Sequence, residues 1–541
     1  MPPPPEAFAF VNGCLKSANF VCPPSVAEGE AETLAQEGFS QRITQRITSH
    51  MTDYNAYETV VGLEVHAQLK TASKLFCGDS TVFGAEPNTN ISPLTLAHPG
   101  TLPRMNRKAV EYAVKMGLAC HCRIIKQNYF ARKNYFYPDL PKGYQVSQHT
   151  TPICSGGYVK IKTGSNEEKR IRLNRIHLEE DAGKSIHDAD ENSTCVDYNR
   201  AGTPLTEIVT EPDIRSGDEA FAYLTEIRRL VRYLDICDGN MEEGSLRYDA
   251  NIPVRKKGET VLGTRVEVKN LNSIRHVKRA IEAEAKRLIE ILDNGGVITQ
   301  ETRSFDAGTG TTFAIRDKED ADDYRYFPEP DLTPFSLDDD FINQIQKNIP
   351  ALQEERIKKY TAEYKLSLYD ATVIAEERAF ADYFESIVAQ LSPLLDGVGG
   401  RPKAAANWML GPVKNWLNKL NSEIDGFPLA ASAIAGIISL VESGKLSFST
   451  ASSRLFPMLL NDPAADPEEL AEKNNLLQES DLSSVGPVID NVLKKFADKV
   501  AEYKKGKKGL LALFAGEVIK QTKGKADPKM THELLIEKLK K

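Results

Sequence analysis

Several features that define common protein classes are missing from this chain of 541 residues. Eight cysteines are too few for a disulfide framework, and no apolar run approaches the roughly 18 to 20 residues that a membrane span needs. Gly183-Lys184-Ser185 has the ending of a phosphate-binding loop, but Leu178 stands where such a loop requires glycine. No G-x-G-x-x-G follows a strand pattern, and neither G-x-S-x-G nor H-E-x-x-H occurs. P-loop, dinucleotide-binding, serine-elbow and zincin enzymes are therefore excluded.

Charge is unevenly distributed along the chain. The formal net charge is −8, which argues against a protein that coats nucleic acid by bulk charge. Residues 494–541 nevertheless contain 14 lysines, no arginine and six acids, a net charge of +8, so the remainder carries −16. Such a lysine-rich tail is typical of a segment that contacts nucleic-acid phosphates with salt-sensitive affinity.

Residues 1–52 are interpreted as an N-terminal extension. They begin with a proline run and contain an acidic stretch at residues 28–32, and the first arginine is Arg42. A transit peptide is basic, rich in serine and poor in acids, and only residues 41–50 lean that way. Among the cysteines, Cys77, Cys120 and Cys122 leave two readings open. Their spacing favours buried thiols over a zinc site.

The composition and the spacing of apolar residues change twice along the remaining chain. Residues 53–336 alternate apolar and polar positions between Gly and Pro breaks, which predicts strands, with helices at Ser216–Leu234 and Ile274–Leu292. Residues 337–427 have 3.6-residue spacing, interrupted at Pro412, and residues 428–541 are helical again. We therefore predict an α+β protein with a mixed α and β first domain, a helical domain and a helical tail domain.

Two stretches of the first domain carry candidate metal ligands. In residues 62–69 alternation places Glu64 and His66 on one face, where a carboxylate and an imidazole could bind a divalent cation. In R-I-H-L-E-E-D-A-G-K-S, residues 175–185, His177 and Glu179 share a face with Asp181, and Glu180 takes the other. Such crowded acids need a cation, arginines or protons to offset their repulsion. A solvated strand end remains the alternative.

Further strands mix acids with cations on their polar faces. Glu207 lies on one such strand, while alternation groups Arg247 with Asp249 and Asn251, and Arg265 with Glu267 and Lys269. Arg132 and Lys133 precede three aromatic residues, a mixture that can contact phosphate and stack a base. Acids that hold Mg²⁺ beside cations that hold phosphate suit a nucleoside triphosphate with Mg²⁺. Cross-strand ion pairs on an exposed sheet are the alternative.

These stretches together resemble one family, the B subunits of aspartyl/glutamyl-tRNA(Asn/Gln) amidotransferase. The matching phrases run in order from Val60 to Leu332 and include V-V-G-L-E-V-H-A-Q-L-K, R-K-N-Y-F-Y-P-D-L-P-K-G-Y-Q, H-L-E-E-D-A-G-K-S, N-R-A-G-T-P-L-T-E-I-V-T-E-P-D, M-E-E-G-S-L-R-Y-D-A-N and D-D-Y-R-Y-F-P-E-P-D-L. The likeness continues more loosely to Lys541. It implies a glutamine-synthetase-like cradle followed by helical units that grip tRNA.

The resemblance also implies a reaction. Members of this family use ATP and Mg²⁺ to phosphorylate the side-chain carboxylate of glutamate on misacylated tRNA(Gln). Ammonia, released from glutamine by a partner amidase A subunit, then displaces the phosphate, and the pair is braced by a small third subunit. This is a ligase that forms C–N bonds. Eukaryotic members work in mitochondria, so the expected compartment is the mitochondrial matrix.

Roles for single residues follow from the same resemblance. It implies that a first strand and the paired glutamates bind metal and that further acids surround the reaction centre. The cations of the polar faces are expected to contact the triphosphate. The metal ligands are Glu64, His66, Glu179 and Glu180; the catalytic acids are Glu180, Glu207, Asp249 and Glu267; the cations are Arg132, Lys133 and Arg247. If Glu180 is a ligand, His177 should point away from the metal. A small-molecule carboxylate–amine ligase and a non-catalytic tRNA-binding scaffold remain alternatives.

Overall fold

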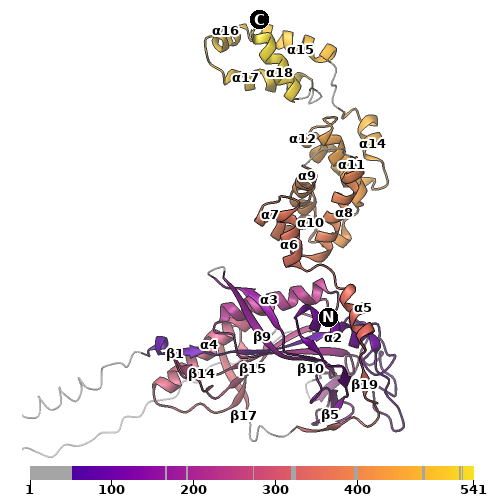
Figure 1. Ribbon diagram of the computed structural model, residues 1–541, viewed down its shortest axis with the longest axis vertical. Coiled ribbons are helices and arrows are strands. Elements are labelled where there is room, and N and C mark those ends of the chain that lie inside the picture. Colours follow the sequence, from indigo (N-terminus) through magenta and orange to yellow (C-terminus); the bar gives the residue numbers. More distant parts are fainter. Residues whose placement is uncertain are drawn as a thin grey trace, which may run out of the picture. The chain divides into compact units, whose positions relative to one another are not determined.

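A large mixed sheet comes first along the chain, and the elements described after it are helices (Figure 1). The computed structural model describes residues 52–540 except 165–166, 191–192, 272, 318–323, 395–399, 478–481, 523–525 and 527. The α+β class is thereby confirmed. The main path of the sheet runs, from edge to edge, through β17 (Thr311–Asp317), β16 (Glu301–Asp306), β15 (Val266–Leu271), β13 (Leu246–Ile252), β2 (Gly62–Gln68), β12 (Pro204–Thr210), β9 (Glu168–Glu180), β6 (Tyr144–Ser147), β5 (Ala131–Asn134) and β18 (Arg325–Pro328).

Neighbouring strands on this path are antiparallel except β15 and β16, which are parallel. Three short strands extend the sheet beside β9: β3 (Arg123–Ile124), β7 (Cys154–Ser155) and β8 (Tyr158–Lys162). Three two-stranded pairs lie outside it: β1 (Tyr57–Thr59) with β14 (Val254–Lys256), β10 (Lys184–Asp190) with β11 (Ser193–Asp197), and β4 (Gln127–Asn128) with β19 (Phe335–Ser336). A 3₁₀ turn, η1 (Tyr54–Ala56), precedes β1.

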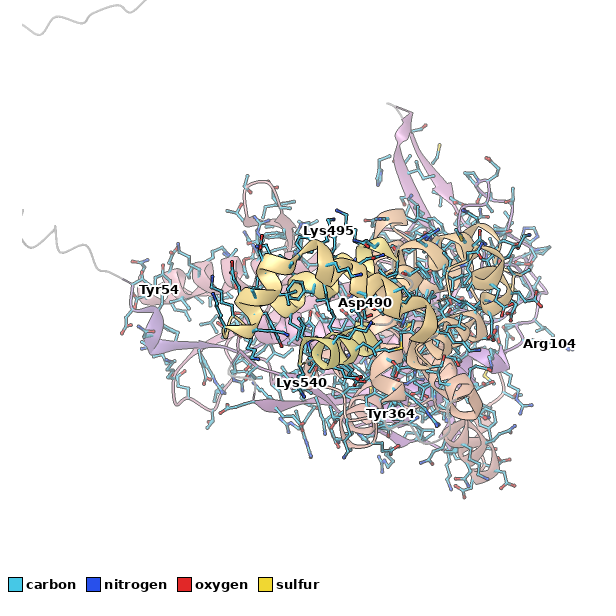
Figure 2. The ribbon with its side chains drawn as sticks, turned by 90° about the horizontal axis from the view of Figure 1, so that it is seen from above. Tyr54, Arg104, Tyr364, Asp490, Lys495 and Lys540 are labelled. Carbon is cyan, nitrogen blue, oxygen red and sulfur yellow. The ribbon has the colours of Figure 1, made fainter. Side chains whose placement is uncertain are left out.

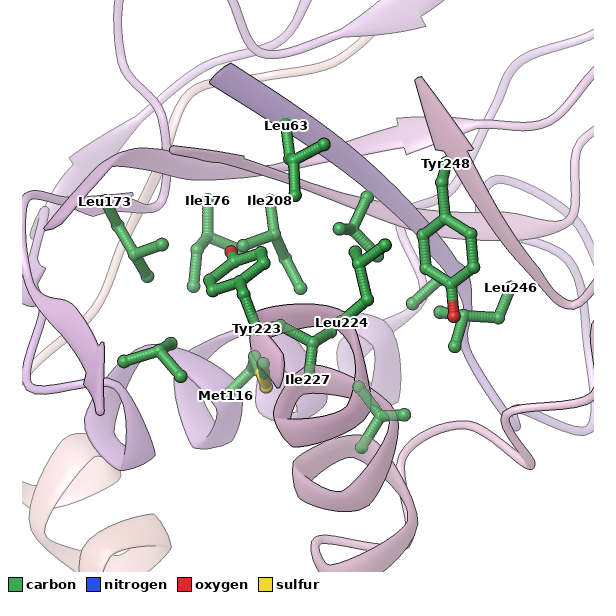
Figure 3. Packing of buried hydrophobic residues seen from close by; sticks show 14 of the residues in the cluster. Leu63, Met116, Leu173, Ile176, Ile208, Tyr223, Leu224, Ile227, Leu246 and Tyr248 are labelled. Carbon is green, nitrogen blue, oxygen red and sulfur yellow. The ribbon is translucent and has the colours of Figure 1, made fainter. Parts of the chain in front are cut away.

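Helices α2 (Arg107–Ala119), α3 (Gly217–Tyr233) and α4 (Ile274–Asp293) pack on the apolar face of the sheet. Figure 3 shows Tyr223, Leu224 and Ile227 of α3 directed at Ile176 and Ile208 of the sheet. Serine caps begin α3 and α4, because Ser216 and Ser273 each accept a backbone N–H bond of the first turn. The alternation predicted for β2 is confirmed, since every second residue is buried. The opposite face of the sheet is left for polar side chains.

The helical region contains α5 (Asp339–Lys347), α6 (Gln353–Ala362), α7 (Leu368–Ile374), α8 (Arg378–Leu394), α9 (Arg401–Trp408), η2 (Met409–Val413), α10 (Lys414–Leu420), η3 (Ile424–Gly426), α11 (Ala431–Glu442), α12 (Phe448–Thr450), η4 (Ala451–Leu455), α13 (Phe456–Asn461) and α14 (Pro467–Lys473). The predicted interruption at Pro412 takes the form of the π-helical segment η2. A proline has no N–H for the helix ladder, so the local winding widens. None of the helices in the described residues combines the length and apolar content needed to cross a bilayer.

The last helices are α15 (Leu482–Lys495), α16 (Ala497–Lys504), α17 (Leu510–Gln521) and α18 (Pro528–Lys540). They share a small core around Ile489, Val492 and Phe514. Figure 2 shows Lys495 and Lys540 on the outside of this group of helices, among many other side chains. Lysines on the solvent side of a compact helical unit are available to a polyanion.

The buried clusters divide the helices at a different place from the predicted boundary. One cluster contains Tyr360 and continues to Leu476, and so includes residues on both sides of the 427/428 boundary. The next begins at Val485. Residues 1–51, which make up nearly all of the predicted N-terminal extension, lie outside the described residues. The domain boundaries remain predictions. The division of the helical cores near residue 480 is a physical feature of the chain.

Candidate active site

Strand register places the polar side chains of four central strands in rows. On β2, His66 pairs with Glu207 of β12, and Glu207 pairs in turn with His177 of β9. On its other side His66 pairs with Arg247 of β13. Two residues along the same strands, Glu64 pairs with Asp249. Directly opposed residues of an antiparallel sheet have Cβ atoms about 4.5–5.5 Å apart, so these charged groups are forced into contact range. They line a cavity of about 1340 Å³.

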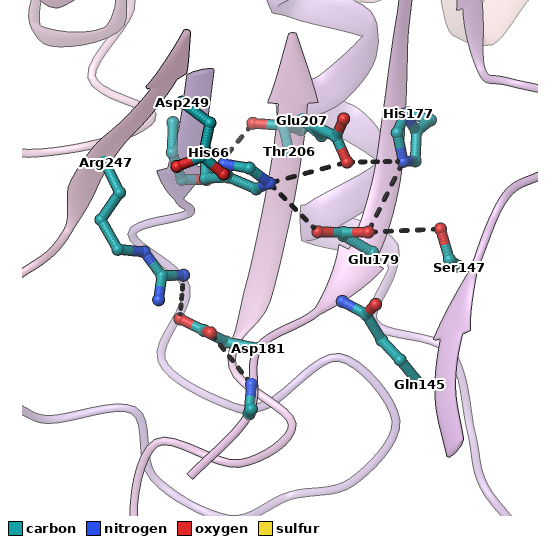
Figure 4. Close-up of polar contacts among 12 residues, drawn as sticks. His66, Gln145, Ser147, His177, Glu179, Asp181, Thr206, Glu207, Arg247 and Asp249 are labelled. Carbon is teal, nitrogen blue, oxygen red and sulfur yellow. Dashed lines mark hydrogen bonds and ion pairs between the residues drawn. The ribbon is translucent and has the colours of Figure 1, made fainter. Parts of the chain in front are cut away.

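The first carboxylate cluster consists of His66, Glu179 and Glu207 (Figure 4). Nε2 of His66 lies 3.6 Å from a Glu207 oxygen and 3.8 Å from a Glu179 oxygen. His177 faces the same two acids from the other side, with Nε2 3.3 Å from Glu207 and 3.5 Å from Glu179. Ser147 donates a hydrogen bond to Glu179 over 3.3 Å. Two imidazoles and two carboxylates therefore meet at one point of the polar face.

The two imidazoles have strongly perturbed acidity. Burial alone would lower the pKa of His66 and of His177, but Glu207 and Glu179 outweigh burial and raise each pKa to about 9. Burial would raise the pKa of Glu207, yet the contact with His177 holds it well below its ordinary value. Nδ1 of His177 is buried without a hydrogen-bond partner. The two acids thus favour the protonated form of both imidazoles.

The second carboxylate cluster consists of Glu64, Asp249 and Glu267. Nζ of Lys269 lies 3.1 Å from Asp249 and 2.9 Å from Glu267. Asn251 donates to Glu64 over 2.9 Å, and Thr302 donates to Glu267 over 3.1 Å. Burial and the nearby Glu207 raise the pKa of Glu64.

The remaining lining groups of the cavity include cations and aromatic rings. Nη2 of Arg247 donates to Asp181 over 2.7 Å. Nζ of Lys133 lies 4.6 Å from the ring centroid of Tyr324. His149 and Tyr326 stack with ring centroids 4.0 Å apart. Acids occupy the middle strands of the polar face, and the aromatic rings gather toward β5 and β18.

The chain matches known proteins over most of its length. A family model described as the GatB/GatE catalytic domain matches residues 59–343, and one described as the GatB domain matches residues 382–539. Three curated relatives are named as B subunits of aspartyl/glutamyl-tRNA(Asn/Gln) amidotransferase. The relative from Thermodesulfovibrio yellowstonii is 47% identical over 484 residues, which cover 90% of this chain and 99% of the relative. The relative from Geobacter sulfurreducens is 47% identical over 488 residues, with 90% and 99% covered. The relative from Pelodictyon phaeoclathratiforme is 49% identical over 483 residues, with 89% and 99% covered.

The chain belongs to the family of aspartyl/glutamyl-tRNA(Asn/Gln) amidotransferase B subunits. The catalytic-domain match covers the sheet and the two carboxylate clusters. As a member of this family, the chain is an amidotransferase subunit of the ligase class.

The sheet brings together most of the site residues predicted from the sequence. One cavity is lined by residues from six strands of the sheet, namely β2, β5, β9, β12, β13 and β15. The predicted site residues that line it are Glu64, His66, Lys133, Glu179, Glu207, Arg247, Asp249 and Glu267. The alternation argument for β9 is confirmed, because His177, Glu179 and Asp181 share this face.

Glu180 does not join the metal ligands predicted with it. Its side chain lies on the opposite face, where it accepts hydrogen bonds from Lys142 and, over 2.8 Å, from the backbone N–H of Val146. It lines a separate cavity of about 220 Å³. The grouping of Glu180 with Glu64 and His66 is therefore corrected, since adjacent residues of a regular strand point to opposite faces. Glu179 takes that position.

Arg132 also lies apart from the clusters. Its guanidinium binds both oxygens of Glu329, over 2.7 and 2.8 Å, and is not among the groups that line the larger cavity. Because Arg132 and Lys133 are adjacent on β5, only one of them can face the cavity, and it is Lys133. The expectation that both cations contact a triphosphate is thereby reduced to Lys133.

Two residues at the clusters were missed or misplaced by the sequence argument. His177 was expected to point away from the metal only if Glu180 were a ligand. Glu180 contacts Lys142 and Val146 on the opposite face, whereas His177 contacts both acids of the first cluster. The alternation of His177 with Glu179 was the signal that could have assigned it there. Lys269 was placed on the correct face but given no role, because the sequence does not show that β15 lies beside β13.

The donor set of the clusters fits a divalent cation. Carboxylate oxygens and a neutral imidazole are ligands that Mg²⁺, Mn²⁺ and similar ions accept in proteins. His66, Glu179 and Glu207 offer ligand atoms that all lie within 4.8 Å of one another, as do Glu64, Asp249 and Glu267. The orphaned Nδ1 of His177 shows that the hydrogen bonding around the first cluster is incomplete.

Proposed function

We propose that this subunit uses ATP and Mg²⁺ to phosphorylate the side-chain carboxylate of glutamate on misacylated tRNA(Gln). Ammonia then displaces phosphate and leaves glutaminyl-tRNA(Gln). Transamidation of misacylated tRNA is the activity of the family. The observation that carries the proposal is the row formed by His66, Glu207 and His177 in a cavity of about 1340 Å³, with Glu179 beside it.

A carboxylate needs this activation before it can react with ammonia. Its oxygen is a poor leaving group, and phosphorylation converts that oxygen into a good one. Phosphoryl transfer depends mainly on positioning and on neutralising charge, so it needs no covalent nucleophile from the protein. This agrees with a cavity lined by acids and cations.

The chain's residues divide this work between them. His66, Glu179 and Glu207 would hold Mg²⁺, which when bound neutralises phosphate charge. His177 holds the two glutamates from the far side, 3.3 and 3.5 Å away, and so fixes their direction. Arg247 and Lys133 present positive charge into the cavity, where phosphate oxygens would bind. Asp181 fixes Arg247 over 2.7 Å.

The partners follow from the role of a B subunit in an enzyme of several chains. An amidase A subunit supplies ammonia, and the pair is braced by a small third subunit. Helices α15–α18 contact the body of tRNA through their exposed lysines, as the lysine-rich composition of residues 494–541 supports. Glutamate on tRNA(Gln) is the substrate.

We also propose a glutamine-synthetase-like arrangement for the cradle and a position in the mitochondrial matrix. The basic residues Arg42 and Arg46, which precede the family match, support that compartment.

The experiment is amidation of glutamyl-tRNA(Gln) by the purified complex with ATP and glutamine. His66→Ala should abolish glutaminyl-tRNA formation and leave the partner's glutaminase activity measurable, because only the phosphorylation step depends on the cradle. Val60→Ala, a change in the core away from the cavity, is the control for folding. Amidation by His66→Ala at the wild-type rate would refute the assignment. Activity on free glutamate without tRNA would favour a small-molecule ligase.

A further inference from the structure

The two carboxylate clusters differ in the group that lies beside the acids. In the first cluster an imidazole, that of His66, lies beside the acids, and imidazole nitrogen is itself a possible metal ligand. In the second cluster the group beside the acids is the ammonium of Lys269, which has no lone pair to offer. An arriving ion therefore finds an additional ligand at the first cluster and a resident cation at the second.

Lys269 is placed against this cluster by two strands. Glu267 and Lys269 are two residues apart on β15 and so share a face, and Asp249 projects beside them from β13. The ammonium lies 2.9 Å from Glu267 and 3.1 Å from Asp249. Two carboxylates at hydrogen-bond distance therefore hold the ammonium in place.

We propose that Lys269 is the built-in cation of the second cluster, which closes this cluster to a divalent ion until a triphosphate draws the ammonium away. The inference rests on the proposed function, because it takes ATP as the ligand. At rest the cradle then holds one divalent ion, at the first cluster. A second ion binds at Glu64, Asp249 and Glu267 only together with the triphosphate.

Electrostatics supports mutual exclusion. A divalent ion at the ligand atoms of Asp249 and Glu267 would sit within a few ångströms of the ammonium. Like charges at that distance repel strongly in a partly buried site. The three acids project from adjacent strands, and Asn251 donates to Glu64 and Thr302 to Glu267, whereas the ammonium ends a long flexible stem. The ammonium is the group that must move.

Lys269 has both room and a destination. Its side chain is 40% exposed and lines the large cavity on a flexible four-carbon stem. A triphosphate in that cavity would present several negative oxygens to the ammonium. Moving from carboxylates to phosphate keeps Lys269 paired, and the vacated carboxylates keep their charge for the second ion. Ion binding and triphosphate binding are thereby coupled through one side chain.

The test counts Mn²⁺ bound to the full complex without nucleotide, by electron paramagnetic resonance of the free ion. Wild type should bind one Mn²⁺ per cradle. Lys269→Met should bind two, the second at least about 100-fold more tightly than in wild type, because the competing charge is gone. Lys269→Arg keeps that charge and is the matched control, with one Mn²⁺. Lys269→Gln, which can still hydrogen-bond both acids, replaces the methionine variant if that variant does not fold.

A second measurement tests whether the ammonium of Lys269 contacts the bound triphosphate. At saturating Mn²⁺, equilibrium dialysis should show that Lys269→Met binds a non-hydrolysable ATP analogue about 10-fold more weakly, because a charge-assisted phosphate contact is lost. Two Mn²⁺ in nucleotide-free wild type, or one in the methionine variant, would overturn the inference. His66→Ala separates the two proposals, since an unchanged Mn²⁺ count there refutes the metal site of the proposed function instead.

Discussion

Adjacent glutamates on β9 give the sharpest test of the site, because Glu179 and Glu180 differ in the face they point to. Replacing each by glutamine preserves size and removes one charge. Glu179 shares a cluster with His66 and Glu207, whereas Glu180 pairs with Lys142 on the opposite face. We predict that Glu179→Gln impairs metal binding, and that Glu180→Gln impairs stability alone.

The magnitudes follow from the contacts. Loss of a group that merely supports a metal ligand costs about 10–100-fold in affinity, so loss of the Glu179 carboxylate should cost at least about 100-fold for Mn²⁺. The Glu180 side chain is 2% exposed and that of Lys142 is 17% exposed. Removing one partner of a buried ion pair costs about 3 kcal/mol, which lowers Tm by about 6 °C in a domain of this size.

The assay combines Mn²⁺ titration of each variant with thermal unfolding of the same preparation. Glu179→Gln should show weak Mn²⁺ binding, and Glu180→Gln should bind Mn²⁺ as wild type does but melt earlier. The reasoning fails if Glu180→Gln loses Mn²⁺ affinity at an unchanged Tm. It fails equally if Glu179→Gln binds Mn²⁺ normally.

Two further predictions concern stability away from the site. Asp213 accepts three hydrogen bonds from Arg172, over 2.7, 2.8 and 3.0 Å, and these lower its pKa. A lowered carboxyl pKa stabilises the fold above the unfolded value and loses that effect as pH falls through the folded one. Asp213→Asn should therefore cost about 1 kcal/mol at pH 7, a low value because Arg172 is largely exposed, and less and less as pH falls through the folded pKa of Asp213, as measured by urea unfolding. Gly157 has φ +94°, and an added Cβ would lie 2.5 Å from the Cys120 carbonyl and 2.6 Å from Cys122 Sγ. Gly157→Ala should thus lower Tm by several degrees without changing Mn²⁺ affinity; an unchanged Tm would contradict the packing argument.

Local pattern predicted the faces of the strands well. Alternation grouped His177 with Glu179 and Asp181, and Arg247 with Asp249, and both groups share the cavity. The helix predicted over Ile274–Leu292 ends one residue later, at Asp293. These features depend on neighbours in sequence, where side-chain direction is fixed by the backbone period.

Strand order and register lay beyond local pattern. Nothing in the sequence near His66 shows that Glu207 will pair with it from β12, or that Lys269 will reach Asp249. Such contacts depend on which strands become neighbours, a property of the whole sheet. The helical cores divide between Leu476 and Val485 for a similar reason, since helices continue on both sides of that point and only packing separates the two cores.

The sheet explains why the site is found on these strands. A strand with neighbours on both sides cannot shift register without turning its buried face to water, and so Leu63 and Val65 on the core face lock Glu64 and His66 on the other. Mutual repulsion among Glu64, Asp249 and Glu267 would separate them on a loop. On adjacent strands this repulsion cannot separate the three acids, so a bound cation that neutralises it is stabilised. Apolar packing on one face of the sheet thereby maintains the charge density that the chemistry on the other face requires.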